Sequence, residues 1–295
     1  MLNGEGMVMV PLLLHEFHRA AGAVFAEVNG REVVSHYGDW LGEYAALREG
    51  AGVLDLSFRG RLCVLGAGNC NDLDLAWLIR VFREVHLVDI DIEAPARALK
   101  RQGVAESAPI HLHAPFDLTA ITARVDQWSG RAPEPGEIDA ALGEIASSPP
   151  PELPAKFEVV LSPCVLSQTF NPARDAMGAT HPRFPKVLAA LRARHLRMML
   201  DLLTPGGKAI LVNDVTSSDR FPPLARVPTG ELPDLMRKLV SEQKCYRGLE
   251  PAAMIAALRS DPRAAKWELA APWLWHVGLE RTYLVYALCI IARMF

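Results

Sequence analysis

The sequence predicts an α/β protein whose mostly parallel sheet is flanked by helices. Two observations support this prediction. From Arg61 onward, short apolar runs of β type alternate with helical segments, and the first of these runs ends in Gly66-Ala67-Gly68. Such alternation is typical of βαβ units. The expected strands are 62–65, 85–88, 110–113, 159–161, 209–212 and 283–291. The expected helices are 74–83, 95–102, 137–145, 188–203, 232–242 and 251–259.

Composition limits the class of protein. The chain has 295 residues, 50% of them hydrophobic, which is enough for one large core. The net charge of −3 gives no reason to expect nucleic acid or an anionic membrane as a partner. Five cysteines lack any C-x-x-C pair and suit a reducing compartment. The apolar run 7–14 lacks the basic start of a signal peptide, and no run reaches the roughly 20 residues of a membrane span. We therefore expect a cytoplasmic protein.

The chain divides at the glycine turn. Residues 1–59 are expected to form a helical cap, and residues 60–295 the main domain. A proline-rich stretch, 127–155, is expected to be a surface insertion between the third and fourth strands, because consecutive prolines continue neither helix nor central strand. The last two apolar runs, 266–277 and 282–293, predict a C-terminal antiparallel hairpin.

The turn after the first strand predicts a nucleoside site. Gly66 and Gly68 allow close approach of a ligand, and Asp89 ends the next strand, where a carboxylate can accept ribose hydroxyls. A dinucleotide site would have a third glycine where this chain has Asn71. Asp72 in the same loop would repel a pyrophosphate but suits a ligand with an ammonium and a sulfonium group. The loop therefore favours S-adenosylmethionine.

Further motifs extend this pattern along the chain. They are Val64-Leu-Gly-Ala-Gly68, Val88-Asp89, Asp117-Leu118, Val159-Val-Leu161 and Leu203-Thr-Pro-Gly-Gly207. With them, residues 60–295 resemble a class I S-adenosylmethionine-dependent methyltransferase. The resemblance implies a Rossmann-like, seven-stranded sheet with a reversed terminal hairpin, and S-adenosylmethionine as the cofactor. It also implies that Gly66 and Gly68 flank the methionine part of the cofactor, that Asp89 takes the ribose hydroxyls and that Asp117 takes the adenine amine.

The expected cofactor site collects residues from all these loops. They are Gly66, Ala67, Gly68, Asn69, Asp72, Asp89, Ile90, Asp117, Leu118 and Ser162. Two alternatives stay open: Asp89 could be a strand-end cap, and Asp117 could be a helix N-cap, because aspartate is favoured there.

Catalytic groups are less defined by the sequence. Methyl transfer needs alignment and exclusion of water, and a base only where the acceptor carries a proton. His181 and Asp214 are the candidates for an acid or base, whereas His195 is expected to be a packing residue. The basic residues 183, 186, 192, 194 and 197 are expected to form a solvated helix face, and no metal site is expected. The stretch 162–168 lacks the Asn/Asp-Pro-Pro-aromatic motif of base and glutamine methylation, so the expected acceptor is a small molecule or a peptide.

The segment before the glycine turn has a different resemblance. Residues 33–38 and 45–60 are similar to the opening of the folate-binding aminomethyltransferase family, the T-protein of glycine cleavage. That similarity stops at the glycine turn, so folate binding is not carried over, and Tyr37 and Trp40 are expected to wall the cofactor pocket. Competing functions for the whole chain are aminopropyl or aminocarboxypropyl transfer from the same cofactor, a non-catalytic nucleoside-binding protein, and a nicotinamide dehydrogenase, which Asn71 disfavours.

Overall fold

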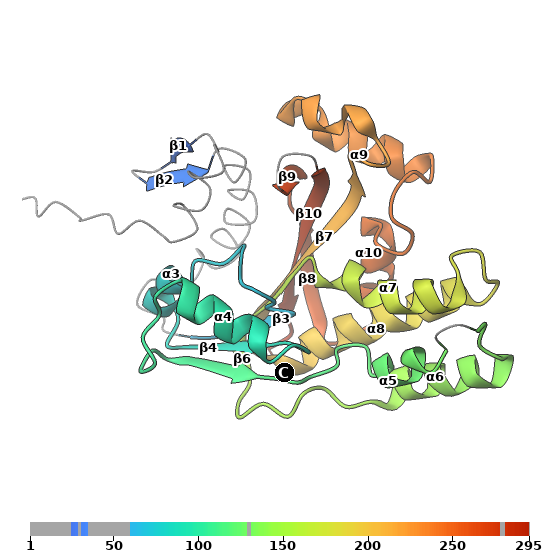
Figure 1. Ribbon diagram of the computed structural model, residues 1–295, viewed down its shortest axis with the longest axis horizontal. Helices are drawn as coiled ribbons and strands as arrows, with labels where there is room; N and C mark the ends of the chain where they lie inside the picture. Colours follow the sequence, from blue (N-terminus) through green and yellow to red (C-terminus); the bar gives the residue numbers. More distant parts are fainter. Residues whose placement is uncertain (1–24, 29–30, 35–59, 129–130, 278–280, 295) are drawn as a thin grey trace, which may run out of the picture.

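The computed structural model describes residues 25–28, 31–34, 60–128, 131–277 and 281–294. Its main sheet has the order β5-β4-β3-β6-β7-β10-β8, with β9 also paired to β10 (Figure 1). Strands β3 to β7 are parallel to one another, and β10 is antiparallel to β7, β8 and β9. The strands are β3 (Arg61–Leu65), β4 (Glu84–Val88), β5 (Ile110–His113), β6 (Phe157–Pro163), β7 (Leu203–Ser217), β8 (Ala264–Leu269), β9 (Trp273–Val277) and β10 (Arg281–Ala292). The predicted Rossmann-like, mostly parallel sheet with a reversed C-terminal hairpin is therefore confirmed.

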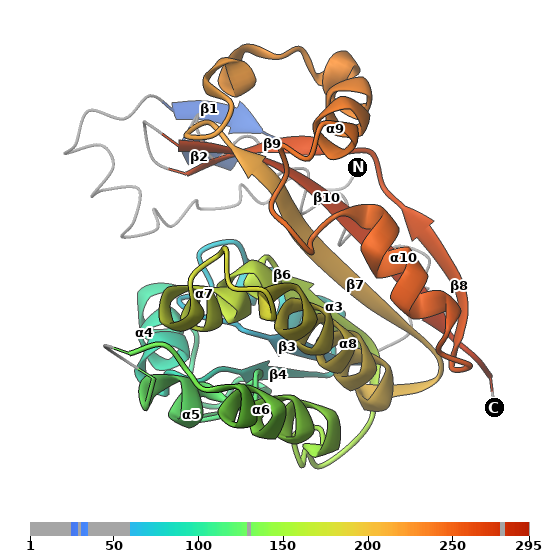
Figure 2. The same ribbon diagram turned by 90° about the vertical axis from the view of Figure 1, so that its right-hand side faces the viewer.

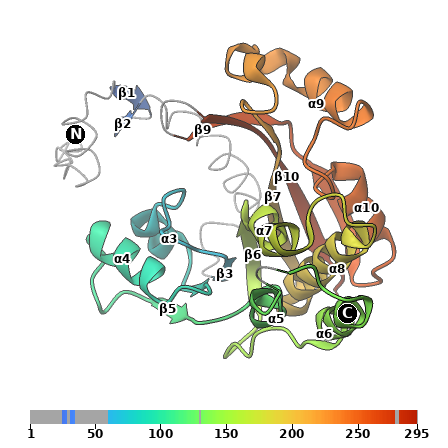
Figure 3. The ribbon, with the colours of Figure 1, turned by 45° about the vertical axis from the view of Figure 1, so that its right-hand side comes forward.

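Helices cover both faces of the sheet. Figure 3 shows α3 and α4 on one side of the parallel strands and α5, α7 and α8 on the other. The helices are α3 (Leu75–Val81), α4 (Glu93–Arg101), α5 (Thr122–Asp126), α6 (Pro135–Ser147), α7 (Val165–Met177), α8 (Phe184–Leu202), α9 (Leu232–Ser241) and α10 (Pro251–Arg259), with 3-10 turns η2 (Pro222–Arg226) and η3 (Thr229–Glu231). No helix among the described residues is both long and apolar enough to cross a membrane.

The core lies on both sides of the sheet, and β3 shows why. Cys63 and Leu65 point into the cluster under α5 to α8, whereas Leu62 and Val64 point into the cluster under α3. All four side chains are fully buried. Strands buried on both faces are apolar without alternation, which is the pattern that made these runs recognisable in the sequence. Strands β7 and β10 are much longer than the others and run side by side past the end of the parallel strands (Figure 2).

Two elements differ from the sequence prediction. No helix is predicted between the fourth strand and residue 188, but the stretch after β6 forms helix α7, which includes Pro172 and buries Leu166 and Phe170. The predicted strand 266–277 is two strands, β8 and β9, which pair with opposite ends of β10. Pro272 lies between them and has no N–H to donate to a ladder. The sheet therefore has the seven strand positions that the resemblance implies, and two short strands, β8 and β9, share the last position beside β10.

The proline-rich stretch is more than a surface insertion. Its predicted helix is present as α6, and the side chains of Ile138, Ala141 and Ile145 are buried against the core. Trp128, near the start of the stretch, is 1% exposed. Apolar residues at helical spacing bury one face of this insertion although prolines flank it.

Arg194 holds this insertion to the domain. It was expected on a solvated helix face but is 3% exposed. Its Nε donates to the carbonyl of Leu118 at 3.0 Å, and its Nη1 donates to the carbonyl of Ser148 at 2.9 Å. One buried guanidinium thus satisfies carbonyls from the loop after β5 and from the end of α6. His195, next along α8, is buried as a packing residue, as expected.

Arg194→Met is expected to lower the free energy of unfolding by about 1–3 kcal/mol, because it leaves buried carbonyls without donors while keeping the side-chain length. Urea denaturation measures the change. Lys186→Met is the matched control, since Lys186 is exposed on the same helix, and its effect should stay within about 0.5 kcal/mol. Equal effects in the two variants would contradict the role given to Arg194.

The predicted helical cap, residues 1–59, lies mostly outside the described residues, as do Tyr37 and Trp40. Where it is described, it is not helical: β1 (Phe25–Val28) and β2 (Arg31–Val34) pair as an antiparallel hairpin. The pairing of Val28 with Arg31 leaves a two-residue connection, and the sequence there is Asn-Gly. Asn-Gly between β-type runs is the strongest short hairpin signal, and it outweighs the helical spacing of the flanking residues.

Candidate functional site

A cavity of about 650 Å³ opens at the carboxyl ends of the parallel strands. The loops that follow β3, β4, β5 and β6 line it, together with α7 and β9. Strand order reverses between β3 and β6, since the chain continues from β3 toward β5 on one side and from β6 toward β7 on the other. Ligands of open α/β sheets bind at such a switch point. The fold therefore places this cavity where a nucleoside ligand is expected.

The glycine turn forms the floor of the cavity. Gly66 has a φ of +70° and Gly68 a φ of +51°, values that favour glycine. The backbone N–H groups of Gly66 and Ala67 both donate to the carbonyl of Val88, at 2.8 and 3.2 Å, which fixes the turn to β4. A Cβ at Gly68 would meet no atom within 4 Å, so that glycine faces open space. Space beside the turn is what a ligand approaching the backbone requires.

Asp89 connects the turn to the end of β4. Its Oδ2 accepts a hydrogen bond from the N–H of Gly68 at 2.7 Å, and its Oδ1 accepts one from the N–H of Asp91 at 2.9 Å. The side chain lines the cavity and is 8% exposed. Each carboxylate oxygen has two lone pairs, so both oxygens can accept one further donor. Asp89 thus caps the end of the strand, as the alternative prediction has it. Its two carboxylate oxygens also keep acceptor capacity for a ligand in the cavity.

Asp117 organises the loop after β5. Its Oδ1 accepts from the N–H and the hydroxyl of Thr119, and its Oδ2 accepts from the N–H of Thr122 at 2.8 Å. Thr122 is the first residue of α5, so this carboxylate ties down the start of the helix. Asp117 also lines the cavity. Both sequence interpretations of Asp117 therefore remain compatible with its position.

The cavity is acidic. Four aspartates line it, and no lysine, arginine or histidine is among the described residues that do so; the four are Asp72, Asp89, Asp91 and Asp117. Burial raises the pKa of Asp72 to about 6. A raised carboxyl pKa means that the anion lacks solvation, which a bound cation would supply. The lining thus favours a positively charged ligand over a phosphorylated one.

Nine of the predicted cofactor residues line this cavity. They are Gly66, Ala67, Gly68, Asn69, Asp72, Asp89, Ile90, Asp117 and Leu118. Ser162, the tenth, lies outside the lining: it is fully buried, and its Oγ is 2.7 Å from Nε2 of His195. Side chains of β6 point alternately to the two faces of the sheet, and Ser162 points toward α8. Its hydroxyl therefore faces the protein interior and not the cavity.

The two predicted acid–base residues also lie outside the lining. His181 sits between α7 and α8, where its Nδ1 accepts from the N–H of Arg183 at 3.1 Å. Asp214 is a buried residue of β7, and burial raises its pKa while a hydrogen bond with Ser167 opposes the shift. The structure does not bring these residues together, and their catalytic roles stay predictions.

Sequence reasoning missed one wall of the cavity. Gln168, Thr169 and Pro172 come from α7, and Trp275 and Val277 come from β9. Since β10 is antiparallel, its first residues and their partners in β9 lie at the carboxyl end of the parallel strands. The predicted hairpin places this run beside the last strand, but the register that pairs Trp275 with Tyr283 cannot be read from the sequence.

Trp275 contributes a large aromatic side chain to the cavity wall. Its ring lies 5.7 Å from that of Tyr283, its cross-strand partner. Its indole Nε1 is buried and has no hydrogen-bond partner among the described residues. The residue lines the cavity, whereas Nε1 itself is covered by neighbouring atoms.

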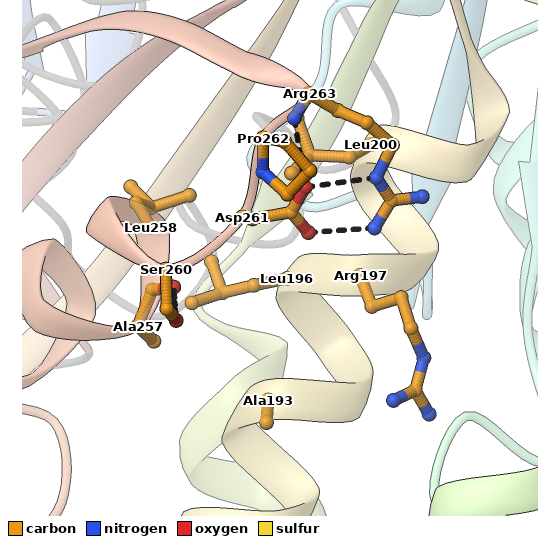
Figure 4. A pocket seen from close by; sticks show the side chains of 10 residues that line it. All are labelled: Ala193, Leu196, Arg197, Leu200, Ala257, Leu258, Ser260, Asp261, Pro262 and Arg263. Atoms are coloured by element: carbon orange, nitrogen blue, oxygen red, sulfur yellow. Dashed lines mark hydrogen bonds and ion pairs between the residues drawn. The ribbon is translucent and has the colours of Figure 1, made fainter.

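A second cavity of about 290 Å³ lies between α8 and the connection from α10 to β8 (Figure 4). Its charged groups are engaged with one another or with the backbone. Arg263 forms a two-bond pair with Asp261, at 2.9 and 2.7 Å, and Arg197 donates to the carbonyls of Ile145 and Ala146. Residues of the parallel strand ends are not among those that line it. We therefore place the functional site in the larger cavity.

Comparisons with known proteins give limited similarity. No family model matches the chain. Among curated proteins, a probable aminomethyltransferase of Aeropyrum pernix is 38% identical over 69 residues, which are 23% of this chain and 18% of that protein. The chain thus matches less than a fifth of that relative's length.

Several solved structures are similar at low identity. The N-methyltransferase NodS of Bradyrhizobium japonicum, in complex with S-adenosyl-L-homocysteine, is 11% identical with a TM-score of 0.45 over 84% of each chain. An rRNA methylase of Streptococcus thermophilus is 12% identical with a TM-score of 0.43, over 85% of this chain and 96% of that one. TehB of Haemophilus influenzae is 12% identical with a TM-score of 0.42, over 85% and 62%. Because these identities and TM-scores are low, we assign the fold from the strand order of the sheet and from the reversed direction of β10.

Proposed function

We propose that this chain is an S-adenosylmethionine-dependent methyltransferase that binds the cofactor in the cavity at the switch point. The acidity of that cavity is the observation that supports the proposal most directly. Four carboxylates and no basic side chain among the described lining residues suit a ligand with a sulfonium and an ammonium group. A dinucleotide brings a pyrophosphate instead, and the dehydrogenase alternative is disfavoured further by Asn71 in the lining.

The residues present fit this cofactor in two ways. Gly68 leaves open space beside the turn, and Asp89 keeps free lone pairs at the end of β4. In the proposed complex, Gly66 and Gly68 lie beside the methionine part, Asp89 accepts the ribose hydroxyls and Asp117 accepts from the adenine amine. Asp72 faces the positively charged end of the ligand.

When bound, S-adenosylmethionine supplies a methyl carbon on which an acceptor lone pair can form a bond, while the carbon–sulfur bond breaks and leaves the thioether S-adenosylhomocysteine. The chain's part is alignment and exclusion of water. Helix α7, whose first residue Val165 lies against Gly66, and strand β9 also line the cavity, and we propose that the acceptor enters between them. We propose a small molecule or a peptide as the acceptor, on the same grounds as in the sequence. For an acceptor that must lose a proton, we propose His181 or Asp214 as the assisting acid or base.

Isothermal titration calorimetry of the full chain tests the cofactor. S-adenosylmethionine and S-adenosylhomocysteine should bind with micromolar affinity, whereas NAD⁺ and NADP⁺ should give no heat. Absence of heat with both S-adenosyl ligands, in protein shown to be folded by circular dichroism, would overturn the proposal. Incubation with candidate acceptors then identifies the reaction, because methyl transfer releases S-adenosylhomocysteine and aminopropyl transfer releases methylthioadenosine.

Cofactor affinity should fall at acid pH because of Asp72. Its pKa is raised to about 6, so the carboxylate that attracts the cation is protonated below that pH. If only the anion binds well, the affinity at pH 5 is about tenfold lower than at pH 7, in proportion to the ionised fraction. Calorimetry from pH 5 to pH 8 measures the profile. Asp72→Asn should bind more weakly at pH 7 and lose most of the pH dependence; an unchanged profile in this variant would assign the titration to another group.

A further inference from the structure

A second group of chemically active side chains lies on the edge of the sheet, away from the cavity. Glu84 and His86 are alternate residues of β4, and His111 and His113 are alternate residues of β5. The two strands are parallel neighbours in which His86 pairs with His111 and Val88 pairs with His113. Because alternate residues of a strand share a face, the four side chains project from the same side of the sheet. None of them is among the residues that line the cofactor cavity.

The distances within this group suit a metal ion. One potential ligand atom each from Glu84, His86 and His111 lies within 4.8 Å of the others. Nε2 of His86 and Oε2 of Glu84 are 3.6 Å apart. Ligand atoms of a tetrahedral zinc site, with bonds of about 2.0–2.1 Å, are about 3.4 Å apart. Small side-chain rotations are therefore enough to bring the three atoms to one ion.

His86 carries the second, independent observation. Its side chain is 1% exposed, and its Nε2 has no hydrogen-bond partner among the described residues, since Oε2 of Glu84 at 3.6 Å is beyond hydrogen-bond distance. Its other ring nitrogen, Nδ1, is 2.8 Å from Nε2 of His113. A buried ring nitrogen without a partner is costly. A proton on Nδ1 of His86, donated to His113, would leave the Nε2 lone pair directed toward Glu84.

This arrangement is common around metal ligands. A ligating histidine usually donates its second ring N–H to a neighbouring acceptor, which fixes the tautomer and the orientation of the ring. His113 provides that acceptor, and Phe157 packs edge-on against the His86 ring, with the centroids 4.9 Å apart. His111 is exposed and gives an ion a path from solvent. Arg83 contacts the other oxygen of Glu84, Oε1, at 3.4 Å, so that Oε2 stays directed at His86.

We propose that Glu84, His86 and His111 form a binding site for one divalent transition-metal ion of the Zn²⁺ type, with His113 as the residue that orients His86. Two imidazoles and one carboxylate suit zinc, cobalt or nickel, whereas magnesium and calcium prefer oxygen ligands alone. The ion would join the edge strand β5 to β4, and the loop after β5 carries Asp117. This site does not depend on the proposed methyltransferase activity.

The test uses the full chain, stripped of metal with a chelator and titrated with ZnCl₂ in competition with a chromophoric chelator. We expect the wild-type chain to bind one Zn²⁺ at this site and to melt at a higher temperature with the ion than without it. His111→Ala and Glu84→Gln, two variants at partly or fully exposed side chains, should each lower the affinity at least about 100-fold, since each removes one of three ligands. Co²⁺ in place of Zn²⁺ should give the visible absorption of a tetrahedral nitrogen–oxygen site.

Two further variants make the test specific. His276→Ala, which removes a histidine of β9 far along the sheet from β5, should leave Zn²⁺ binding unchanged. His113→Ala should lower the affinity by about tenfold while the Co²⁺ spectrum keeps its form, because the ligands remain. The proposal is overturned if the wild-type chain takes up no Zn²⁺, if His111→Ala and Glu84→Gln bind as the wild type does, or if His276→Ala loses as much affinity as they do.

Discussion

Gly66→Ala is expected to lower the free energy of unfolding by about 2–5 kcal/mol, more than any other single methyl group added to the cofactor loop. Two costs combine. A residue with a side chain pays about 1–2 kcal/mol in the left-handed conformation at a φ of +70°. The new Cβ would also lie 2.2 Å from Cγ2 of Val165, a buried side chain at the start of α7, and overpacking of this kind costs about 1–3 kcal/mol. Urea denaturation of the purified variant measures the total.

Gly68→Ala is the matched control, because it shares the positive φ but meets no atom within 4 Å. It should lose only the backbone cost, about 1–2 kcal/mol. Combining Gly66→Ala with Val165→Ala should cost less than the two single losses together, since removal of the valine methyls relieves part of the clash and leaves only Cβ of residue 165, at 2.6 Å, too close to the new Cβ. Equal losses in Gly66→Ala and Gly68→Ala, or strict additivity in the double variant, would show that contact with Val165 is not what requires glycine at position 66.

Asp89→Ala should weaken the binding of S-adenosylmethionine by about 100-fold or more. The substitution removes the acceptor of the Gly68 and Asp91 N–H groups and, in the proposed complex, the acceptor of the ribose hydroxyls. A hydrogen bond to a charged group contributes about 1.5–3 kcal/mol, and 100-fold in affinity corresponds to about 2.8 kcal/mol. Calorimetry with S-adenosylhomocysteine, which keeps the ribose, should give a loss of the same size.

Asp91→Asn controls for the loss of negative charge. Asp91 also lines the cavity, but its side chain is 49% exposed and is paired with Arg97 at 3.2 Å. The affinity of the Asp91→Asn variant for S-adenosylmethionine should stay within about threefold of the wild-type affinity, because screening by solvent weakens an exposed charge. A loss in Asp91→Asn that equals the loss in Asp89→Ala would mean that the general acidity of the cavity, rather than the position of Asp89, governs affinity.

The central strands could be predicted from the sequence because they are buried on both faces. The run at 62–65 is apolar throughout, the run at 85–88 is apolar except for the buried His86, and glycine or acid follows each run. Helix α7 could not be predicted in the same way, since Pro163 and Pro172 both argue against a helix and only tertiary packing of Leu166 and Phe170 outweighs them. The hairpin β1–β2 is a different case: its Asn-Gly connection is a local signal that predicts a hairpin, although a helical cap is expected there.

The same distinction applies to the cavity. Residues in the loops that directly follow strands, such as Gly68, Asp89 and Asp117, can be placed at one edge from topology alone. Trp275 could not, because its position depends on the register between β9 and β10. Arg194 looked like a surface residue because its helix is rich in basic side chains, and its carbonyl partners lie 46 and 76 residues away in the chain. Long-range polar contacts of this kind leave no periodic pattern in a sequence.

The division of the last strand position into β8 and β9 has a practical consequence for engineering. β8 pairs with Leu288–Ala292 and closes the edge of the sheet, whereas β9 pairs with Arg281–Val285 and reaches the cavity. Strand β10 is held along its other side by β7 over most of its length. Under the proposed function, Trp275 and Val277 of β9 are therefore the first positions to randomise in a search for altered acceptor preference.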